Sequence, residues 1–240
     1  MIPSSSITFL PPDYSAIKLV GDFEELIATP FGDGVNALCW PRTLPGDFRE
    51  IVERLAVGEG RKPVERPRLE SLDLSVAGRV ARDILLDDLR LLRECGLDPS
   101  LDCIRQYPRD TEAGPIPTDV YSFHADSALV PADTYLCTYY GAASEGLRND
   151  QARRRVDVPE TRAALLSVFG DGEGAAFDDY LEENCFNLHY APLPGAQPFS
   201  FDPGNLWRIA CDYPGSPVPP CIHRAPETPP DGPPRLLLIS

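Results

Sequence analysis

Histidine is scarce in this chain, which has three among its 240 residues: His124, His189 and His223. A metal site made only of histidines would need all of them, whereas a mixed site of histidine and carboxylate needs fewer. The seven cysteines are odd in number and include no Cys-x-x-Cys pair, so the usual signature of a cysteine zinc site is missing. We expect a reduced and mostly buried set of cysteines.

Several other signatures are also missing. No apolar run approaches the length of a transmembrane helix, and the first residues lack the basic and apolar regions of a secretory signal, so we expect a cytoplasmic protein. The glycine-rich run 170–174 is not followed by the Gly-Lys-Ser/Thr of a phosphate loop. There is no Gly-x-Ser-x-Gly elbow either, which argues against a serine hydrolase of that kind.

The chain has an excess of acidic side chains, with 37 Asp and Glu against 22 Lys and Arg and a net charge of −15. Such a chain repels phosphate backbones and anionic lipid surfaces, so we expect neither nucleic acid nor a membrane as a partner. Proline is abundant, with 27 residues, and it ends helices and is kept out of central strands. Many loops and short elements are therefore expected. No feature of the sequence indicates an oligomeric state.

Apolar periodicity and composition predict the main helices and strands. Helices are expected at 45–57, 74–95, 161–169 and 175–184, and strands at 34–40, 101–107, around His124, 134–140, 205–210 and 235–240. The charged segment 58–68 is expected to be a loop, and 185–190 is a weaker strand candidate. A β-sandwich or barrel of this length is commonly one domain, and we predict a single domain here. Because helices dominate the first half and strands the second, a helical or mixed part, 1–100, is expected to pack on a β-barrel core, 101–240.

The stretch Tyr121-Ser122-Phe123-His124-Ala125-Asp126 places an imidazole and a carboxylate two residues apart. On a β-strand such residues point to the same face, so both side chains can reach one point. A second histidine from elsewhere would complete the His/carboxylate/His facial triad that binds Fe(II) in non-haem oxygenases. His223, near the C-terminal end, is the candidate, and Arg235 follows it by about a dozen residues.

This order of His-x-Asp, a long β-rich interval, a distal His and then an Arg resembles the 2-oxoglutarate/Fe(II)-dependent dioxygenase superfamily. That superfamily is built on a double-stranded β-helix, a jelly-roll barrel of the cupin-like type. The segment Asp-Pro-Gly-Asn-Leu-Trp at 202–207 is similar to the Pro-Gly-Asp turn that often precedes the distal histidine there, with Asn205 in place of Asp. The implied fold class is mainly β with added helices.

Shorter segments resemble an uncharacterised bacterial family known only as a domain of unknown function. That family has an Asn-x-x-x-Trp-x-Arg start and a His-Arg-(small)-Pro end. The segments that carry the resemblance are 35–42, 123–126, 136–141 and 223–226. This second resemblance supports the oxygenase-like fold and implies no particular substrate.

The resemblance implies a role for each site residue. Fe(II) would be held by His124, Asp126 and His223. The far carboxylate of 2-oxoglutarate would bind Arg235, whose planar fork suits a carboxylate, and a hydroxyl from Thr138 or Tyr140 would add a hydrogen bond. The implied reaction is the hydroxylation of a C–H bond of a small molecule or amino-acid-like substrate, with O₂ as co-substrate.

Two other functions stay open at this point. One is a cupin-like metal dioxygenase that does not use 2-oxoglutarate, and the other is a non-catalytic jelly-roll binding protein. Three features have no firm assignment. His189 is either structural or lines the pocket. The run Arg153–Arg155 is either a solvated loop or a binding site for an acidic substrate. The segment 141–159 is long and polar enough to form a lid.

Overall fold

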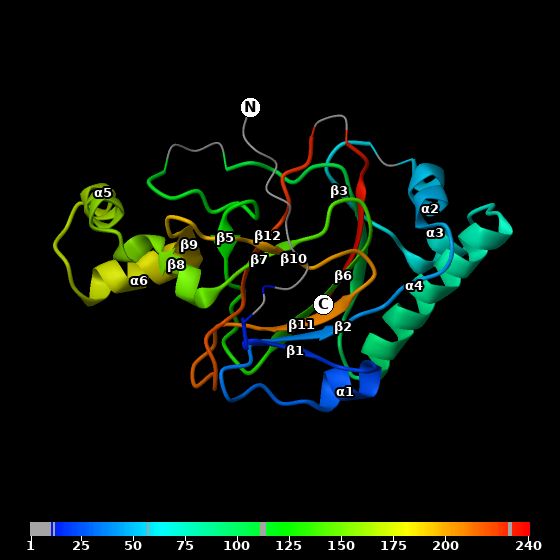
Figure 1. Cartoon of the computed structure of the whole chain (residues 1–240). Helices are drawn as coiled ribbons and strands as arrows, with labels where there is room; N and C mark the ends of the chain where they lie inside the picture. The colour runs from blue at the N-terminus through cyan, green and yellow to red at the C-terminus, as the bar shows by residue number, and fades with distance from the viewer. Residues whose placement is uncertain (1–10, 12, 57, 111–113, 230–231) are drawn as a thin grey trace.

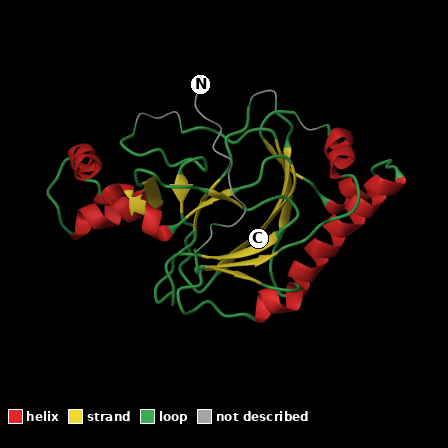
Figure 2. Ribbon diagram, in the orientation of Figure 1, coloured by secondary structure: helices red, strands yellow, loops and turns green. Residues whose placement is uncertain are grey.

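The computed structural model describes residues 11, 13–56, 58–110, 114–229 and 232–240. The parts of the expected helices and loops that fall on 1–10, 57, 111–113 and 230 lie outside these residues. Within the described part, the chain forms a mixed α/β structure in which two curled β-sheets face each other (Figure 2).

The larger sheet has seven strands and includes the first and the last strand of the described chain. All of its pairings are antiparallel except that between the first two strands, β1 and β2, which are parallel. Its strand order is β1 (Ile17–Leu19), β2 (Ala37–Trp40), β11 (Leu206–Ala210), β6 (Asp133–Tyr140), β13 (Arg235–Ile239), β4 (Ser100–Ile104) and β3 (Arg61–Pro63).

The smaller sheet has six short strands, all paired antiparallel. Its order is β10 (Phe199–Ser200), β7 (Glu145–Leu147), β12 (Ile222–Arg224), β5 (Phe123–His124), β9 (His189–Pro192) and β8 (Ala152–Arg154). From β4 to β7, and again from β10 to β13, successive strands lie alternately in the larger and the smaller sheet. Strands far apart in the sequence are therefore brought together between the sheets.

The helices lie at the two ends of this pair of sheets (Figure 1). The first four, α1 (Phe23–Ala28), α2 (Phe48–Leu55), α3 (Arg66–Glu70) and α4 (Val76–Glu94), cover the outer side of the larger sheet. The last two, α5 (Pro159–Phe169) and α6 (Ala175–Glu183), lie beyond the smaller sheet. Three single 3₁₀ turns lie between the strands and helices of this part of the chain: η1 (Asn149–Gln151), η2 (Arg155–Asp157) and η3 (Phe186–Leu188).

The two long N-terminal helices form where their caps and apolar stripes predict them. The side chain of Asp47 accepts from the Glu50 amide at the start of α2, and that of Ser75 accepts from the Gly78 amide at the start of α4. The face of α4 that packs on the sheet carries Ala81, Leu85, Leu89 and Leu92, all buried. The helices expected at 45–57 and 74–95 are confirmed, each a few residues shorter than expected.

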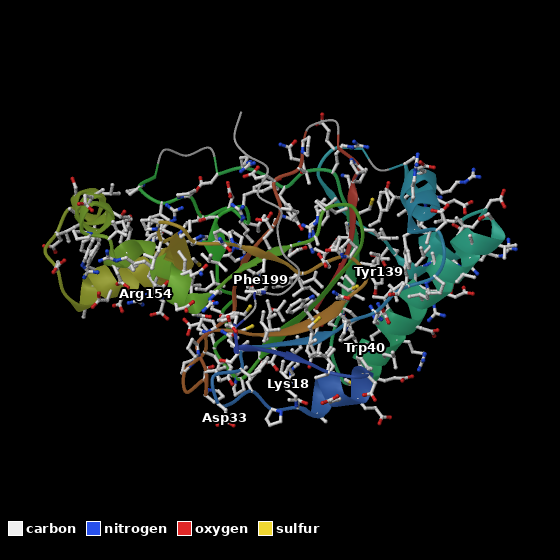
Figure 3. The ribbon with its side chains drawn as sticks, viewed as in Figure 1. Lys18, Asp33, Trp40, Tyr139, Arg154 and Phe199 are labelled. Atoms are coloured by element: carbon white, nitrogen blue, oxygen red, sulfur yellow. The ribbon has the colours of Figure 1, made fainter. Side chains whose placement is uncertain are left out.

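Alternation along the central strand β6 divides the core into two layers. Tyr135, Cys137 and Tyr139 pack against the helices, whereas Leu136 packs between the sheets. Figure 3 shows Tyr139 on the helix side and Phe199 in the space between the sheets. The inner face of the larger sheet therefore points toward the smaller sheet, and side chains on this face lie between the two sheets.

A buried ion pair joins the N-terminal segment to α4 and β6. Arg42 Nη1 lies 2.8 Å from Asp88 Oδ1, and Tyr139 donates to the other oxygen of Asp88 at 2.5 Å. The Arg42 amide donates to Asn205 Oδ1, and Arg42 Nε donates to the Gly204 carbonyl oxygen. The Trp-x-Arg segment and the Pro-Gly-Asn turn, both noted in the sequence, thus bind each other and have a structural role.

The expected fold class is borne out in its coarse features, a mixed α/β structure with two β-sheets and added helices, and the strand expected at 34–40 forms as β2. The structure corrects other expectations about elements. The segment 58–68, expected as a loop, contains β3 and the start of α3; β3 is an exposed edge strand, which leaves no apolar pattern to detect. In 185–190 a 3₁₀ turn precedes β9.

Two expectations about composition can also be compared with the structure. None of the helices in the described part of the chain is long and apolar enough to cross a lipid bilayer. All seven cysteines are unpaired thiols. Five of them, Cys39, Cys103, Cys137, Cys211 and Cys221, are buried, and Cys95 and Cys185 are exposed.

Candidate metal centre

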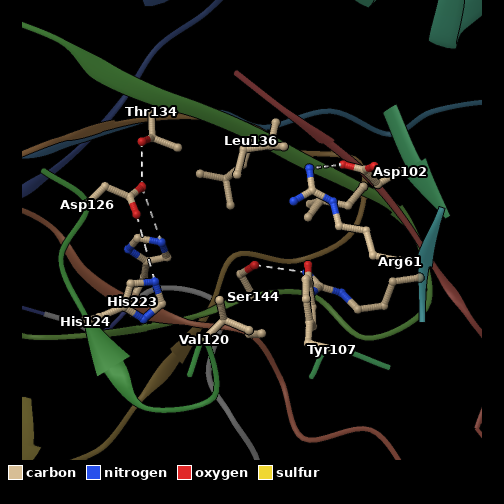
Figure 4. A pocket seen from close by; sticks show the side chains of 14 residues that line it. Arg61, Asp102, Tyr107, Val120, His124, Asp126, Thr134, Leu136, Ser144 and His223 are labelled. Carbon is tan, nitrogen blue, oxygen red and sulfur yellow. Dashed lines mark hydrogen bonds and ion pairs between the residues drawn. The ribbon is translucent and has the colours of Figure 1, made fainter. Parts of the chain in front are cut away.

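Two histidines of the smaller sheet meet through strand pairing. His223 on β12 is the direct antiparallel partner of His124 on β5, and their ring centroids are 4.6 Å apart. The Asp126 carboxylate faces both rings (Figure 4), at 3.9 Å from His124 Nε2 and 3.7 Å from His223 Nε2. The structure thus brings together the three residues that the sequence nominated as metal ligands.

Asp126 lies just beyond the end of β5, and backbone contacts fix its position. The preceding Ala125 amide donates to the Leu188 carbonyl oxygen at 3.0 Å, and the Asp212 amide donates to the Asp126 carbonyl oxygen at 2.7 Å. On its side chain, Oδ2 accepts a 2.6 Å hydrogen bond from the Thr134 hydroxyl of β6. The carboxylate is therefore held from both sheets.

Backbone carbonyls orient both rings. His124 Nδ1 lies 2.8 Å from the Ser122 carbonyl oxygen, and His223 Nδ1 lies 3.3 Å from that of Cys221. Because a carbonyl oxygen only accepts, Nδ1 is the donor to it in each ring, and Nε2 is left to face Asp126. Metal-binding histidines usually have this arrangement, with the second ring nitrogen donating to a carbonyl or carboxylate.

The local electrostatics favour the protonation states of His124 and Asp126 that bind a cation. Burial, together with the neighbouring His223, lowers the pKa of His124 to about 4, so this imidazole is neutral near pH 7. Burial raises the pKa of Asp126, but His223 and the Thr134 hydrogen bond outweigh it, and the pKa lies below its usual value. Neutral imidazole and ionised carboxylate are the forms that bind metals.

The geometry fits one metal ion. All three ligand atoms lie within 4.8 Å of one another. Ligand atoms bound at about 2.0–2.2 Å on one face of an octahedron are about 3 Å apart, so the measured N–O separations of 3.7 and 3.9 Å would have to shorten by somewhat less than about 1 Å on metal binding. Two imidazole nitrogens and one carboxylate oxygen form the donor set of the facial triad that takes Fe(II). The cluster could hold such an ion.

The cluster forms one end of a cavity of about 140 Å³ between the sheets. Figure 4 shows His124, His223 and Asp126 grouped at one side, with Arg61, Asp102 and Tyr107 at the other. Thr134, Ser144 and Arg235 also line the cavity, and its apolar walls come from Val120, Leu136, Ala225, Leu237 and Ile239. A space of this size holds a small organic molecule beside the cluster.

Arg235 lies in this cavity as a buried cation without a counter-ion. Its side chain is 1% exposed, and Nη2 donates to Ser144 Oγ at 3.0 Å and to Thr138 Oγ1 at 3.3 Å. Its Nε and Nη1 have no partner among the described residues, and burial lowers its pKa. Burying an unpaired charge is unfavourable, and a carboxylate that accepted from the free donors would offset that penalty.

Gly141 allows the first residue of β13 to sit this close to the end of β6. It has a φ of +84°, and a Cβ there would come within 2.8 Å of the Pro234 carbonyl oxygen and 3.1 Å of Arg235 Cα. A side chain at this position would displace the backbone that carries Arg235.

The structure places Thr138 and Tyr140, the two residues expected to offer a hydroxyl to 2-oxoglutarate, in different surroundings. Thr138 accepts from Arg235, as just described. Tyr140 does not line the cavity and packs instead with the core beneath the helices. The pairing of β6 with β13 skips one residue here, since Leu237 is opposite Thr138 but Leu236 is opposite Tyr140. This β-bulge turns Tyr140 to the helix side.

Sequence reasoning missed Thr134 and Ser144. Thr134 has the same parity as Thr138 on β6, so strand alternation could have placed it on the inner face. Ser144 follows the strand in a segment that the sequence suggested as a lid, 141–159. Two short parts of that segment, β7 and β8 with three residues each, instead pair in the smaller sheet, and their few apolar residues hid the strands.

A second guanidinium closes the far side of the cavity. Arg61 Nη2 lies 2.8 Å from Asp102 Oδ2, and the Asp102 side chain is 1% exposed. Arg61 and Tyr107 also line a wider hollow on the surface, so these two side chains stand between that hollow and the cavity. Nothing in the sequence distinguished Arg61 from the other arginines of the charged segment.

The remaining histidine lies beside the cluster, and the run of arginines lies on and just after the edge strand β8 of the same sheet. His189 on β9 is the direct partner of His124 and is 4% exposed, with 5.8 Å between the ring centroids. It is outside the group of three ligands and does not line the cavity. Arg153 and Arg154 are exposed, whereas Arg155 is half-buried.

No protein-family model matches this chain, and a search of curated proteins finds no relative.

Proposed function

We propose that this chain is a non-haem Fe(II), 2-oxoglutarate-dependent oxygenase that hydroxylates a C–H bond of a small molecule or amino-acid-like substrate. The observation that carries the proposal is that a His/Asp/His cluster shares one small cavity with a buried arginine that has no acidic partner among the described residues. The His/Asp/His cluster suits a divalent metal, and the buried arginine suits the carboxylate of a co-substrate.

We also propose that the two sheets form a double-stranded β-helix. The alternation of β4 to β7 and of β10 to β13 between the larger and the smaller sheet is the pattern expected of a jelly roll with two antiparallel sheets. In this reading β1, β2 and β3 extend the larger sheet, and β8 and β9 extend the smaller one. The resemblance of the sequence to oxygenases and to the uncharacterised bacterial family belongs to the same proposal.

Each residue would have a defined task. His124, Asp126 and His223 would hold Fe(II), with Thr134 orienting the carboxylate and the carbonyls of Ser122 and Cys221 orienting the rings. Three protein ligands leave positions free for 2-oxoglutarate and O₂, which together with the iron supply the oxidising chemistry.

The rest of the cavity would position the co-substrate and keep water out. The free Nε and Nη1 donors of Arg235 would bind the far carboxylate of 2-oxoglutarate in a bidentate manner, while Thr138 and Ser144 keep the guanidinium in place. Leucine side chains from β6 and β13, Leu136 and Leu237, would line the space between the two ends. An apolar wall strengthens the electrostatic contacts inside it.

Calorimetric titration of 2-oxoglutarate into protein loaded with Mn(II), as a redox-inert substitute for Fe(II), tests this proposal. We expect binding that needs the metal and that weakens at least about tenfold in Arg235→Gln, since a hydrogen bond to a charged group is worth about 1.5–3 kcal/mol. Glutarate lacks the keto oxygen that chelates the metal, so it should bind more weakly than 2-oxoglutarate.

The other outcomes separate the alternatives. Stoichiometric metal binding without any binding of 2-oxoglutarate would favour a cupin-like dioxygenase that needs no co-substrate of this kind. Failure of wild-type protein to take up Mn(II) or Fe(II) would leave a non-catalytic jelly-roll binding protein.

A further inference from the structure

Arg155 is a half-buried guanidinium without an acidic partner. The other arginines of its run are used on the surface, since Arg153 donates to the Asp157 carbonyl oxygen at 2.7 Å and Arg154 pairs with the Asp157 carboxylate at 3.0 Å. The side chain of Arg155 makes no ion pair and no hydrogen bond within the described part of the chain, and its Nε is buried. The chemistry of this arginine is therefore unused by the fold.

Other buried polar atoms of the described residues also lack a partner, and two of them belong to elements that pack against the turn of Arg155. His189 Nδ1, Asn187 Oδ1 and Ser122 Oγ are also buried without a hydrogen-bond partner among the described residues. The side chains of His189 and Ser122 belong to residues that are only 4% and 7% exposed. The turn η2, which carries Arg155, packs against both β9 and η3, which carry His189 and Asn187. Native proteins leave few buried polar atoms unsatisfied, so several in adjacent elements indicate a bound group.

This group of residues adjoins the candidate metal centre. The strand order β12, β5, β9 places His223, His124 and His189 in one row across the smaller sheet, each directly opposite the next. Arg155 lies close enough to His189 to contribute to the lowering of its pKa, after the larger effect of burial, whereas Asp119 and Asp110 act in the opposite direction. A ligand of Arg155 would thus lie near His189, whose ring is 5.8 Å from that of the candidate metal ligand His124, in the part of Figure 3 that carries Arg154.

A negatively charged ligand suits this group best. Water can satisfy orphaned hydrogen-bond groups, but only an anion would also offset the partial desolvation of the guanidinium. In the described part of this acidic chain, Arg155 and Arg235 are the two arginines whose pKa is lowered, in both by burial. The acid nearest in sequence to Ser122, Asp119, is engaged by the amides of Asp110 and Tyr121. The anion has to come from outside the described residues.

We propose that Arg155, Asn187 and His189 form the subsite that binds the carboxylate group of the oxygenase's substrate, and that this substrate is a small amino acid or hydroxy acid. The inference rests on the proposed function, because only a neighbouring metal centre gives this subsite a reaction to serve. The planar fork of Arg155 would accept the carboxylate in a bidentate manner. Asn187 Oδ1 would accept from the amino or hydroxyl group next to it, and His189 would donate to the carboxylate.

The test compares acids with their uncharged amides. The common L-amino acids and a set of 2-hydroxy acids, each paired with its primary amide, are titrated calorimetrically into protein loaded with Mn(II) and 2-oxoglutarate. We expect at least one acid to bind about tenfold or more tightly than its amide. Arg155→Gln should remove that preference, whereas Arg153→Gln, a change of the same kind two residues away, should keep it.

A second variant guards against a general loss of structure. Asn187→Asp has nearly the same shape but adds a negative charge at the subsite, so it should also abolish the preference for the acid while the protein stays folded. If no acid in the panel binds more tightly than its amide, or if the preference survives in Arg155→Gln, the inference is wrong.

Failure of this inference is distinguishable from failure of the proposed function. Binding of 2-oxoglutarate to the Mn(II)-loaded protein reports on Arg235 and the metal cluster, and Arg155→Gln should leave it unchanged. If wild-type protein bound 2-oxoglutarate but showed no preference for acids, the subsite alone would fail. If an acid bound through Arg155 but 2-oxoglutarate did not bind, the oxygenase proposal alone would fail.

Discussion

His223 lies directly opposite His124 on neighbouring antiparallel strands, and the two rings are 4.6 Å apart. These residues are almost one hundred positions apart in the chain. Their proximity is set by strand register, which is stiffer than a loop, and both rings are further fixed by carbonyl oxygens two residues upstream. A site with this construction is formed before any metal arrives, which has measurable consequences.

Substitution of either facing histidine should abolish metal binding. In His124→Ala or His223→Ala, we expect the affinity for Fe(II) or Co(II) to fall by more than about 100-fold, because even hydrogen-bond partners of metal ligands are worth about 10–100-fold. His189→Asn is the matched control, since His189 lies one strand further along the same row and outside the ligand group. Anaerobic metal titration followed by metal analysis measures the effect. Equal losses in all three variants would contradict the assignment.

The hydroxyl of Thr134 should contribute to metal affinity without being a ligand. Thr134→Val keeps the shape but removes the 2.6 Å hydrogen bond to Asp126, so we expect the affinity to fall by about tenfold. Thr134→Ser keeps the hydroxyl and should bind metal like the wild type. Competition titration with a metal indicator measures both variants. An affinity in Thr134→Val that matches the wild type would show that Asp126 needs no such support.

Removing the charge of Arg235 should not destabilise the ligand-free protein. Its buried guanidinium has no acid to pair with, so in Arg235→Met we expect the free energy of unfolding to stay the same or to rise by about 1–3 kcal/mol, while binding of 2-oxoglutarate is lost. Arg42→Met provides the contrast, because it would leave Asp88 buried without its ion pair and should lose about 3–5 kcal/mol.

Urea denaturation without metal and co-substrate measures both variants of this comparison. A marked loss of stability in Arg235→Met would mean that the guanidinium serves the fold, and the argument for a bound carboxylate would lose its basis.

Stability of the metal-free protein should fall between pH 7 and pH 5. Burial, with help from His223 and Arg155 respectively, lowers the pKa values of His124 and His189 to about 4. In the unfolded chain both histidines have pKa values of about 6.5, so in this range the unfolded state binds more protons and acidification favours unfolding. Each histidine should account for about 1–2 kcal/mol of the loss at pH 5.

The control for this pH dependence is removal of one titrating group. In His189→Asn, measured by urea denaturation with a chelator present, the difference in unfolding free energy between pH 7 and pH 5 should be smaller by the contribution of His189, about 1–2 kcal/mol. A difference as large as that of the wild type would show that His189 titrates normally in the folded protein.

Much of the site could be proposed from the sequence because its residues lie on strands in a meaningful order. His124 and Asp126 are local neighbours, so their proximity follows from the sequence, although Asp126 lies just beyond the end of β5 and its carboxylate is oriented by Thr134. His223 and Arg235 were candidates because their order resembles that in the dioxygenase superfamily, and the structure places both of them at the same cavity. The two longest N-terminal helices were equally accessible, since caps and apolar spacing are local signals.

Other features depend on long-range contacts and leave no local pattern. The bulge that turns Tyr140 away from the cavity arises from pairing with β13, almost one hundred residues later. The exposed edge strand β3, which carries Arg61, shows no apolar alternation. Arg155 looks like its two neighbours in sequence, and only the packing of its turn against β9 sets it apart.

The most direct test of the central claim is an anaerobic titration of Fe(II) into the protein with and without 2-oxoglutarate, followed in the visible range. We expect a weak metal-to-ligand charge-transfer band that needs both components, vanishes in His124→Ala and weakens in Arg235→Gln. Iron binding without any such band would contradict the use of 2-oxoglutarate, and the absence of iron binding in freshly reduced wild-type protein would contradict the metal centre itself.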